Sequence, residues 1–326
     1  MERYRGRFAP TPSGPLHFGS LVAAVGSYLE ARCHGGDWLV RIDDLDPPRT
    51  VPGAAEAILR TLEACGLTWD GTVAWQSRRS AAYHAALHRL RQDHLLYPCA
   101  CSRRDIADAA IAGAEGAVYP GTCRNGLVAQ RRARALRLDT RGRIITFDDA
   151  IQGRVTRDIA AEIGDFVLYR ADRVFAYHLA TVVDDAEQGI THVVRGADLL
   201  TSTPRQILLQ RMLALPTPAY AHLPVAVDTQ GAKLSKQTLA APVEARDPLP
   251  ALVRVLRFLG HPPPHEARPP SPPAAPAGGP PSAACPIPRA AQEVQGDGRL
   301  QATRCNPPPT THARNSSPGS RRSRWR

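Results

Sequence analysis

The sequence predicts an α/β protein, in which a parallel sheet with helices is interrupted by a smaller inserted α+β subdomain. Two observations lead to this class. The chain opens with a strand, a glycine turn, a helix and a second strand, which is the order of a parallel βαβ unit. A cysteine-bearing stretch with alternating apolar residues follows, and the strand and helix patterns resume after residue 176. With 326 residues, 43% of them hydrophobic, the chain can fill two compact domains.

The first stretch, RFAPTPSGPLHFGS at residues 7–20, is predicted to end a strand and begin a helix. Its prolines and Gly14 force a turn, because proline fixes φ and glycine allows positive φ. Apolar residues then recur at helical spacing over residues 21–29, until a glycine pair ends the helix. His17 and Gly19 lie on its first turn, where unpaired N–H groups can bind an anion. We expect His17 to contact a phosphate, with a simple helix cap as the alternative.

A strand over Asp37–Ile42 follows, rich in β-branched and aromatic residues. It leads into an acidic run that begins with Asp43. Open α/β sheets bind ligands at the carboxyl ends of their strands, so these carboxylates are candidate ligand groups. For Asp44 and Asp46, a role as turn or cap aspartates is the ordinary alternative. Amphipathic helices are predicted next, over residues 54–65 and 79–93.

Three cysteines lie within 25 residues: Cys99 and Cys101 form a CxC pair, and Cys123 follows a Pro-Gly turn. The grouping is typical of a structural zinc site, but neither a histidine nor a fourth cysteine lies between them to complete four ligands. Chance clustering of buried cysteines is the alternative. The chain has seven cysteines, an odd number at uneven spacing, which argues against a disulfide framework.

Residues 96–176 form the predicted insertion. Its strands are expected at residues 135–139, 144–148 and 165–170. A helix or strand over Tyr177–Asp185 returns to the main domain. The strand over 191–196 carries Arg195 at its carboxyl end, where a guanidinium can bind a carboxylate or phosphate, or form only a surface salt bridge. Helices are expected over residues 203–213 and 251–260.

Lysine is almost absent from this chain. Of 41 basic residues only Lys233 and Lys236 are lysine, and both lie in one loop, KLSKQ. A loop that keeps lysine in an arginine-rich chain needs a compact point charge, which suits a triphosphate that loses pyrophosphate. A solvated basic turn is the alternative, but it gives no reason for lysine here and arginine elsewhere.

The net charge of +11 indicates a polyanionic partner. Residues 261–326 carry nine arginines against three acidic residues, so the first 260 residues carry the remaining +5, which fits the docking of a folded RNA. These last 66 residues hold 16 of the 31 prolines and almost no periodic apolar pattern, so a disordered tail is expected. No run of 18 apolar residues and no signal-peptide pattern is found, and we expect a cytoplasmic protein without a membrane partner.

Together, HFGS at residues 17–20 and KLSKQ at 233–237 resemble the two signatures of class I aminoacyl-tRNA synthetases. Ser20 replaces the final histidine of the first signature, and Gln237 replaces the final serine of the second. The segments RFAPTPSGPLHFGS, RIDDLDPPR, CxC with YxxxC, and HVVRGADLL are similar to the glutamate branch, and within it to the short glutamyl-queuosine tRNA(Asp) synthetase family. The resemblance covers about residues 3–260.

The resemblance implies a Rossmann-like, HUP-type nucleotide-binding domain in two halves, 1–95 and 177–260, around a zinc-bearing insertion at 96–176, with the tail at 261–326. It implies one structural Zn²⁺ held by Cys99, Cys101, Tyr119 and Cys123. It implies ATP contacts at His17, Gly19, Lys233 and Lys236, of which His17 and Lys236 are catalytic. The implied L-glutamate pocket consists of Arg7, Phe8, Ala9, Pro10, Thr11, Asp43, Tyr177 and Arg195. Position 43 is usually glutamate in the family, and aspartate reaches one methylene less far, so a longer or water-mediated contact to the substrate ammonium is expected.

The implied reaction is ATP-dependent, tRNA-independent activation of L-glutamate, with Mg²⁺ expected to assist, followed by transfer to the cyclopentene ring of queuosine in tRNA(Asp). The nearest alternative is a truncated glutamyl-tRNA synthetase that charges the 3′ end of tRNA(Glu). After Gly260 we expect no folded anticodon-reading domain, which favours the first reading. A nucleotidyltransferase without an RNA partner and a non-enzymatic RNA-binding zinc module are further alternatives. A monomer is expected.

Overall fold

The computed structural model describes residues 3–109, 111–113, 116–127, 131–227, 242–261 and 301–303. The loop with Lys233 and Lys236 lies outside the described residues, as does most of the tail predicted over residues 261–326. Within the described part of the chain, no helix is both long and apolar enough to cross a membrane.

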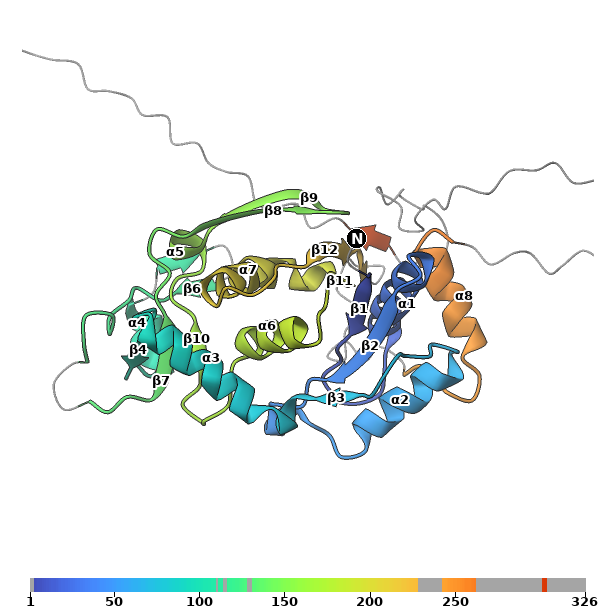
Figure 1. Cartoon of the computed structure of the whole chain (residues 1–326), viewed down its shortest axis with the longest axis horizontal. Coiled ribbons are helices and arrows are strands. Elements are labelled where there is room, and N and C mark those ends of the chain that lie inside the picture. The colour runs from blue at the N-terminus through green and yellow to red at the C-terminus, as the bar shows by residue number, and fades with distance from the viewer. Residues whose placement is uncertain are drawn as a thin grey trace, which may run out of the picture.

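Parallel strands form the centre of the molecule (Figure 1). One set is β1 (Arg5–Phe8), β2 (Asp37–Ile42) and β3 (Ala74–Trp75), paired in parallel in that order. The other set includes the parallel pair β11 (His192–Gly196) and β12 (Ala219–Leu223). The two sets meet at β1, because the N–H of Thr191 donates to the carbonyl of Arg5 at 3.0 Å. The predicted parallel α/β sheet is confirmed.

Helices cover both faces of these strands. On one face α1 (Phe18–Cys33), α2 (Ala54–Ala64) and α8 (Leu249–Phe258) contribute side chains to a core that includes Val194. On the other face α3 (Ser80–Gln92), α6 (Tyr177–Glu187) and α7 (Thr203–Met212) share a second core with Val193. Neighbouring residues of one strand thus enter opposite cores, as the pleat requires. The helices predicted over residues 21–29, 54–65, 79–93, 203–213 and 251–260 are confirmed, and the segment from Tyr177 is a helix.

The inserted segment is mostly antiparallel, as predicted. Strands β4 (Leu96–Cys99), β7 (Ala135–Leu138) and β10 (Val167–Tyr169) form one antiparallel sheet in the order β10-β7-β4. Strands β8 (Ile144–Asp149) and β9 (Gly153–Asp158) form a long hairpin whose end joins the main sheet, where Asp149 pairs with Tyr220 of β12. Leu138, Ile145 and Phe166 belong to the same core as α6 and α7. The segment predicted as an insertion therefore shares its core with α6 and α7, which follow it.

Shorter elements complete the described chain. They are η1 (Pro47–Arg49), η2 (Gln76–Arg78), α4 (Arg103–Ala109), β5 (Ile111–Gly113), β6 (Gly116–Val118), α5 (Ile159–Glu162), η3 (Ala197–Ser202), β13 (Val225–Val227) and β14 (Gln301–Thr303). β14 pairs antiparallel with β13, so three residues of the predicted tail form a strand. Pairing of this kind satisfies backbone N–H and C=O groups that an edge strand otherwise leaves open.

Candidate active site

A cavity of about 340 Å³ lies where β1, β2 and β11 end and α1 begins. This is the edge of the sheet where open α/β folds bind ligands. Every residue predicted for the amino-acid pocket lines it, together with His17 and Gly19 of the predicted ATP site. These residues are Arg7, Phe8, Ala9, Pro10, Thr11, His17, Gly19, Asp43, Tyr177 and Arg195. The structure thus brings together side chains that are up to 188 positions apart in the sequence.

Asp43 provides the buried negative charge of the cavity. Its backbone N–H donates to the carbonyl of Pro10 at 3.0 Å, which joins the end of β2 to the chain leaving β1. Oδ1 accepts a hydrogen bond from Nε of Arg41 at 2.9 Å. Burial raises the pKa of Asp43 to about 6, although the Arg41 charge opposes the shift. At neutral pH the carboxylate is therefore ionised and can accept a bond from an ammonium group.

Arg7 contributes a positive charge to the cavity, and its guanidinium is paired with a carboxylate. Nε and Nη2 of Arg7 donate to the two oxygens of Asp185 at 3.2 and 3.3 Å. Asp185 also accepts a 2.7 Å bond from Nη1 of Arg41. Arg41 is fully buried, and Arg7 and Asp185 are both nearly so. Buried charges of this kind need partners, and the shared carboxylate supplies one to each arginine.

Arg41 and Asp185 were not predicted as residues of the site. A signal for them exists, since Arg41 is a charged residue in a strand whose neighbours Val40 and Ile42 are fully buried. The adjacent pair Asp184–Asp185 likewise interrupts an apolar stretch of α6. A charge inside an apolar element is a candidate for a buried ion pair.

Arg195 projects from the end of β11 and is also buried. Nη1 donates to the hydroxyl of Tyr177 at 3.4 Å, and Nη2 donates to Thr203 Oγ1 and Gln206 Oε1, both at 2.8 Å. A surface salt bridge was the alternative for this residue; among the described residues no carboxylate pairs with it, so that alternative is wrong. The cavity therefore has two buried guanidinium groups and one buried carboxylate in its wall, and the exposed Arg49 and Asp198 also line it.

His17 occupies the first turn of α1 as a cap. Nδ1 accepts a hydrogen bond from the N–H of Ser20 at 3.3 Å, and Nε2 lies 2.9 Å from Ser20 Oγ. One of the first backbone donors of the helix is thereby satisfied by the side chain. The phosphate contact of His17 stays a prediction, while the cap that was its alternative is present. Ser20, which replaces the histidine of the family signature, holds the imidazole.

The described residues on both sides of the lysine loop reach this cavity. Before the loop, Pro224 and Val225 line the cavity wall. After the loop, the N–H of Val243 donates to the carbonyl of Leu16 at 2.8 Å, and Pro242 forms a bridge with His17. The chain thus leaves the cavity before residue 228 and returns beside His17 after residue 241.

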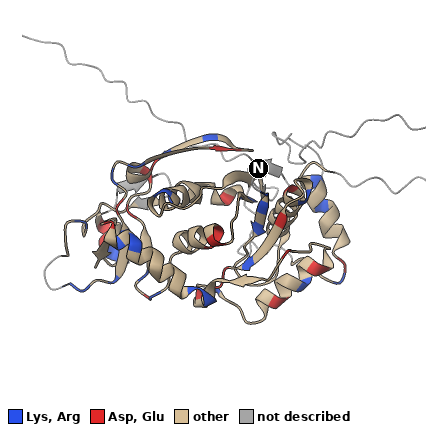
Figure 2. Ribbon diagram, viewed as in Figure 1, with Lys and Arg blue, Asp and Glu red and all other residues tan. Residues whose placement is uncertain are grey.

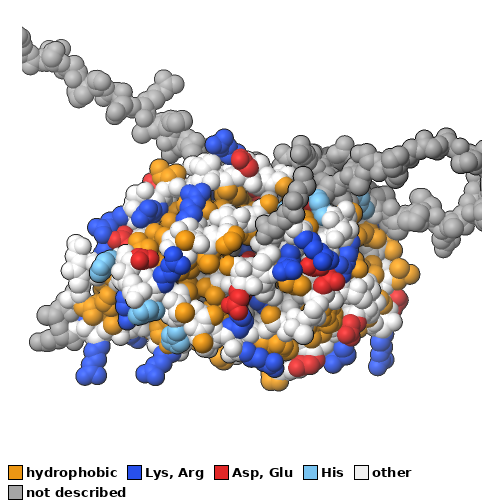
Figure 3. All heavy atoms as spheres, in the orientation of Figure 1, with side chains coloured by type: hydrophobic (Ala, Val, Ile, Leu, Met, Phe, Trp, Pro, Cys, Tyr) orange, Lys and Arg blue, Asp and Glu red, His pale blue; other side chains and the backbone are white. Residues whose placement is uncertain are grey.

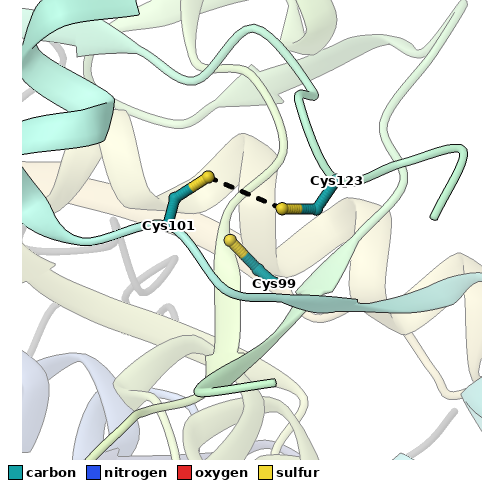
Figure 4. Close-up of side chains that lie close together, drawn as sticks. All are labelled: Cys99, Cys101 and Cys123. Atoms are coloured by element: carbon teal, nitrogen blue, oxygen red, sulfur yellow. Dashed lines mark hydrogen bonds between the residues drawn. The ribbon is translucent and has the colours of Figure 1, made fainter. Parts of the chain in front are cut away.

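The three predicted metal-binding cysteines come together in the insertion (Figure 4). The Sγ atoms of Cys99, Cys101 and Cys123 all lie within 4.8 Å of one another, and those of Cys101 and Cys123 are 3.5 Å apart. The hydroxyl oxygen of Tyr119 lies 3.5 Å from the Sγ atoms of Cys99 and Cys101. A tetrahedron with Zn–S bonds of about 2.3 Å and a Zn–O bond of about 2.0 Å separates its sulfurs by roughly 3.8 Å and oxygen from sulfur by roughly 3.5 Å.

These donors therefore fit a tetrahedral metal ion. Burial raises the pKa of Cys101 to about 11, so a thiolate there needs a neighbouring cation. Arg137, which the sequence analysis did not single out, supplies part of this charge. Its Nε donates to Cys99 Sγ at 3.3 Å, and its guanidinium lies 3.9 Å from the ring centroid of Tyr119. Chance clustering of buried cysteines gives no reason for this convergence of donors.

Comparison with known proteins shows the family of the chain. A family model for the catalytic domain of class I tRNA synthetases (E and Q) matches residues 3–268. A glutamyl-Q tRNA(Asp) synthetase of Aromatoleum aromaticum is 61% identical over 261 residues, which are 80% of this chain and 82% of that protein. A glutamyl-Q tRNA(Asp) synthetase of Dechloromonas aromatica is also 61% identical, over 79% of this chain and 86% of that protein.

Solved structures give the same result at lower identity. The chain is similar to a glutamate tRNA ligase from Elizabethkingia meningosepticum, crystallised in complex with its amino acid, with a TM-score of 0.63 and 30% identity. The match covers 72% of this chain and 52% of that ligase, so the chain spans about half the length of this solved relative. The chain belongs to the class I tRNA synthetases of the glutamate and glutamine branch, and within them to the glutamyl-Q tRNA(Asp) synthetase family.

Proposed function

We propose that this protein is a ligase that activates L-glutamate with ATP, without the help of tRNA, and transfers it to queuosine at the wobble position of tRNA(Asp). One observation carries the proposal: two buried guanidinium groups and one buried carboxylate line a single cavity beside a helix start. Glutamate has two carboxylates and one ammonium group, so its charges are opposite in sign to the buried charges of the cavity wall. We place the enzyme in the cytoplasm as a monomer.

Substrate binding follows from this charge pattern. Asp43 accepts from the substrate ammonium through Oδ2, which has no hydrogen-bond partner among the described residues, while Oδ1 stays with Arg41. Arg7 and Arg195 bind the carboxylates through the nitrogens that Asp185 and the Arg195 partners leave open. Tyr177 lines the cavity beside Arg195, and its hydroxyl accepts a bond from Nη1 and helps to orient the guanidinium.

The first chemical step forms the adenylate. An oxygen of the glutamate α-carboxylate attacks the α-phosphorus of ATP, the bond to the bridging oxygen breaks, and pyrophosphate leaves. His17, the start of α1 at Gly19, and Lys233 and Lys236 stabilise the phosphate charge in this proposal. Mg²⁺, the usual counter-ion of ATP, would neutralise part of the same charge.

The second step transfers the acyl group. A hydroxyl of the queuosine cyclopentene ring attacks the carbonyl carbon of glutamyl-adenylate, the mixed anhydride bond breaks, and AMP leaves while the hydroxyl proton is lost. The acyl group moves directly, so no side-chain nucleophile takes part. The chain holds both partners in place, which lowers the entropic part of the barrier.

A single structural Zn²⁺ would be held by Cys99, Cys101, Cys123 and Tyr119, with Arg137 compensating the negative charge of these ligands. When bound, the ion would fix the loop between β4 and β7 and take no part in the chemistry. The fold of this loop would then depend on metal.

Two assays test the proposal. Pyrophosphate exchange is measured with L-glutamate and no RNA, and the acylated nucleotide is then mapped in purified tRNAs with labelled glutamate. We expect exchange without tRNA and label on the wobble nucleotide of tRNA(Asp). Matched tRNA(Asp) from cells that lack queuosine should stay unlabelled. Label at the 3′ end of tRNA(Glu) would reject the proposal in favour of the truncated glutamyl-tRNA synthetase.

A further inference from the structure

The guanidinium of Arg195 donates a hydrogen bond to a buried histidine on the neighbouring strand. His222 lies on β12 directly beside Arg195 of β11 in the parallel register, and it is fully buried. Its Nε2 lies 3.1 Å from Nε of Arg195. Its Nδ1 lies 2.6 Å from Oδ2 of Asp149, and Oδ1 of the same carboxylate accepts the backbone N–H of His222 at 3.1 Å. Three charged or polar groups from three strands are thus joined in series.

The guanidinium fixes the protonation of this imidazole. Arginine has five N–H donors and no acceptor, so the ring nitrogen that faces Arg195 Nε must be the unprotonated one. The ring proton then lies on Nδ1 and points at Asp149. Burial lowers the pKa of His222, which also favours the neutral ring. Only the neutral Nδ1–H tautomer satisfies all three groups.

The other donors of Arg195 are engaged on the same side. Nη2 donates to Thr203 and Gln206 of α7, and Thr203 Oγ1 also lies 3.0 Å from His222 Nε2. Among the described residues Nη1 contacts only the half-exposed Tyr177, at 3.4 Å. Nε and Nη2 are therefore occupied by acceptors of the protein, and the Nη1 edge remains for a ligand.

We infer that Asp149 and His222 form a relay that positions Arg195 for a carboxylate of the substrate. His222 is a positioning residue, because it touches Arg195 and does not line the cavity. The inference deepens the proposed function, since the carboxylate concerned is that of L-glutamate. Without the Nε2 acceptor, a buried Nε–H of a charged group loses its partner, and the guanidinium turns away to find another. Second-sphere partners of this kind set the orientation of the group that binds.

Substitutions at position 222 distinguish a role in positioning Arg195 from a role in folding alone. His222→Phe keeps a ring and removes both nitrogens, and His222→Gln places an amide oxygen near the former Nε2. We expect His222→Phe to raise the KM for glutamate in pyrophosphate exchange by about ten- to a hundredfold, the value of one hydrogen bond to a charged group. The KM for ATP should change less than about threefold, and His222→Gln should recover most of the loss.

Tyr220→Phe is the matched control on the same strand. It removes the hydroxyl that accepts a 3.0 Å bond from Gln210, another buried hydrogen bond, without removing any bond to Arg195. Its unfolding temperature should fall while the KM for glutamate stays unchanged. If His222→Phe does not fold, Asp149→Asn replaces it as the test variant. This substitution weakens the acceptor that stabilises the Nδ1–H tautomer of His222, so it should also raise the KM for glutamate.

The tautomer gives a readout that does not depend on activity. In the ¹⁵N spectrum of the wild-type protein with labelled histidine, His222 should show a protonated Nδ1 and an unprotonated Nε2. A protonated Nε2, or an unchanged glutamate KM in the folded position-222 and Asp149 variants, would overturn the relay. Failure of the wild-type protein to activate glutamate would instead reject the proposed function, while the ¹⁵N spectrum would still decide the tautomer.

Discussion

The carboxyl group of Asp43 should give glutamate binding its pH dependence. Burial raises its pKa to about 6, so below pH 6 it is mostly protonated and loses its attraction for the substrate ammonium. We expect the KM for glutamate to rise by about tenfold for each pH unit below 6, and to level off above pH 7. Pyrophosphate exchange between pH 5 and 8 measures this profile. Asp43→Asn should show a high KM with no such rise at low pH, and an identical profile in both proteins would contradict the assignment.

Arg41 should contribute far more to stability than an exposed arginine. It is fully buried and bonds to Asp43 and Asp185. Arg41→Met leaves Asp43 without its cation and Asp185 with Arg7 alone, which costs about 3–5 kcal/mol of unfolding free energy. Arg3→Ala removes an exposed ion pair with Asp37 and should cost below about 1 kcal/mol. Urea unfolding of both variants compares the two, and equal losses would refute the buried network.

For individual residues, the sequence predicted most of the side chains that line the cavity but few of the residues that hold those side chains in place. Arg7, Asp43 and Arg195 follow from strand ends and from the family resemblance. Asp185 and His222 do not, because their roles depend on which strand and helix lie beside them. A sequence shows that a charged residue lies within an apolar element, but it does not show which distant residue pairs with that charge.

At the level of the elements, the segment that carries Cys99, Cys101 and Cys123 allows a direct test of zinc binding. We expect purified wild-type protein to hold one zinc per chain and Cys101→Ser to lose most of it, because three ligands bind far more weakly than four. Elemental analysis and the unfolding temperature measure the loss. Cys33→Ser is the matched control, since Cys33 is an exposed cysteine of α1 outside the cluster. Wild-type protein without zinc would contradict the proposed metal site.

Element boundaries agree closely with the sequence patterns where turn chemistry is strong. The α1–β2 turn is an example: Gly35 has a φ of 59°, and a Cβ on Gly36 would lie 2.4 Å from the carbonyl oxygen of Tyr4. The segment from Tyr177 was ambiguous between helix and strand, because its apolar run has no clear period. Tyr119 was expected as a ligand only through the family resemblance, and its hydroxyl now lies beside the thiols.

For the whole molecule, charge should govern the encounter with RNA. The net charge is +11 and arises mostly from arginine, with basic residues on several helices and strands (Figure 2). On the face shown in Figure 3 these side chains are scattered among acidic and apolar ones. If about three phosphates are neutralised, raising the salt from about 50 to 200 mM should increase the KM for tRNA at least tenfold.

The control for this salt effect is the first half-reaction. Glutamate-dependent pyrophosphate exchange without RNA should change much less over the same salt range, because its charges lie in a cavity that solvent ions screen poorly. Equal salt dependence of both steps would show that the effect is not one of RNA docking.

The parallel α/β class and the family were predictable from the sequence, and both are confirmed, the family over residues 3–268. The division at residues 95 and 176 stays a prediction, and the shared core of the insertion with α6 and α7 is something a linear pattern does not reveal. Helices and strands follow from local periodicity, whereas the joining of Asp149 on β8 to β12 depends on contacts across 71 residues.

The sharing of Asp185 between Arg7 and Arg41 has an evolutionary consequence. Arg41 also bonds to Asp43, so Arg7 and Asp43, two of the side chains proposed to select the amino acid, belong to one chain of contacts. A lineage that replaced a member of this chain by a residue of different charge would pass through an ancestor with an unbalanced interior charge. A switch to another amino acid would therefore require concerted replacements, and the preference would be inherited as a block.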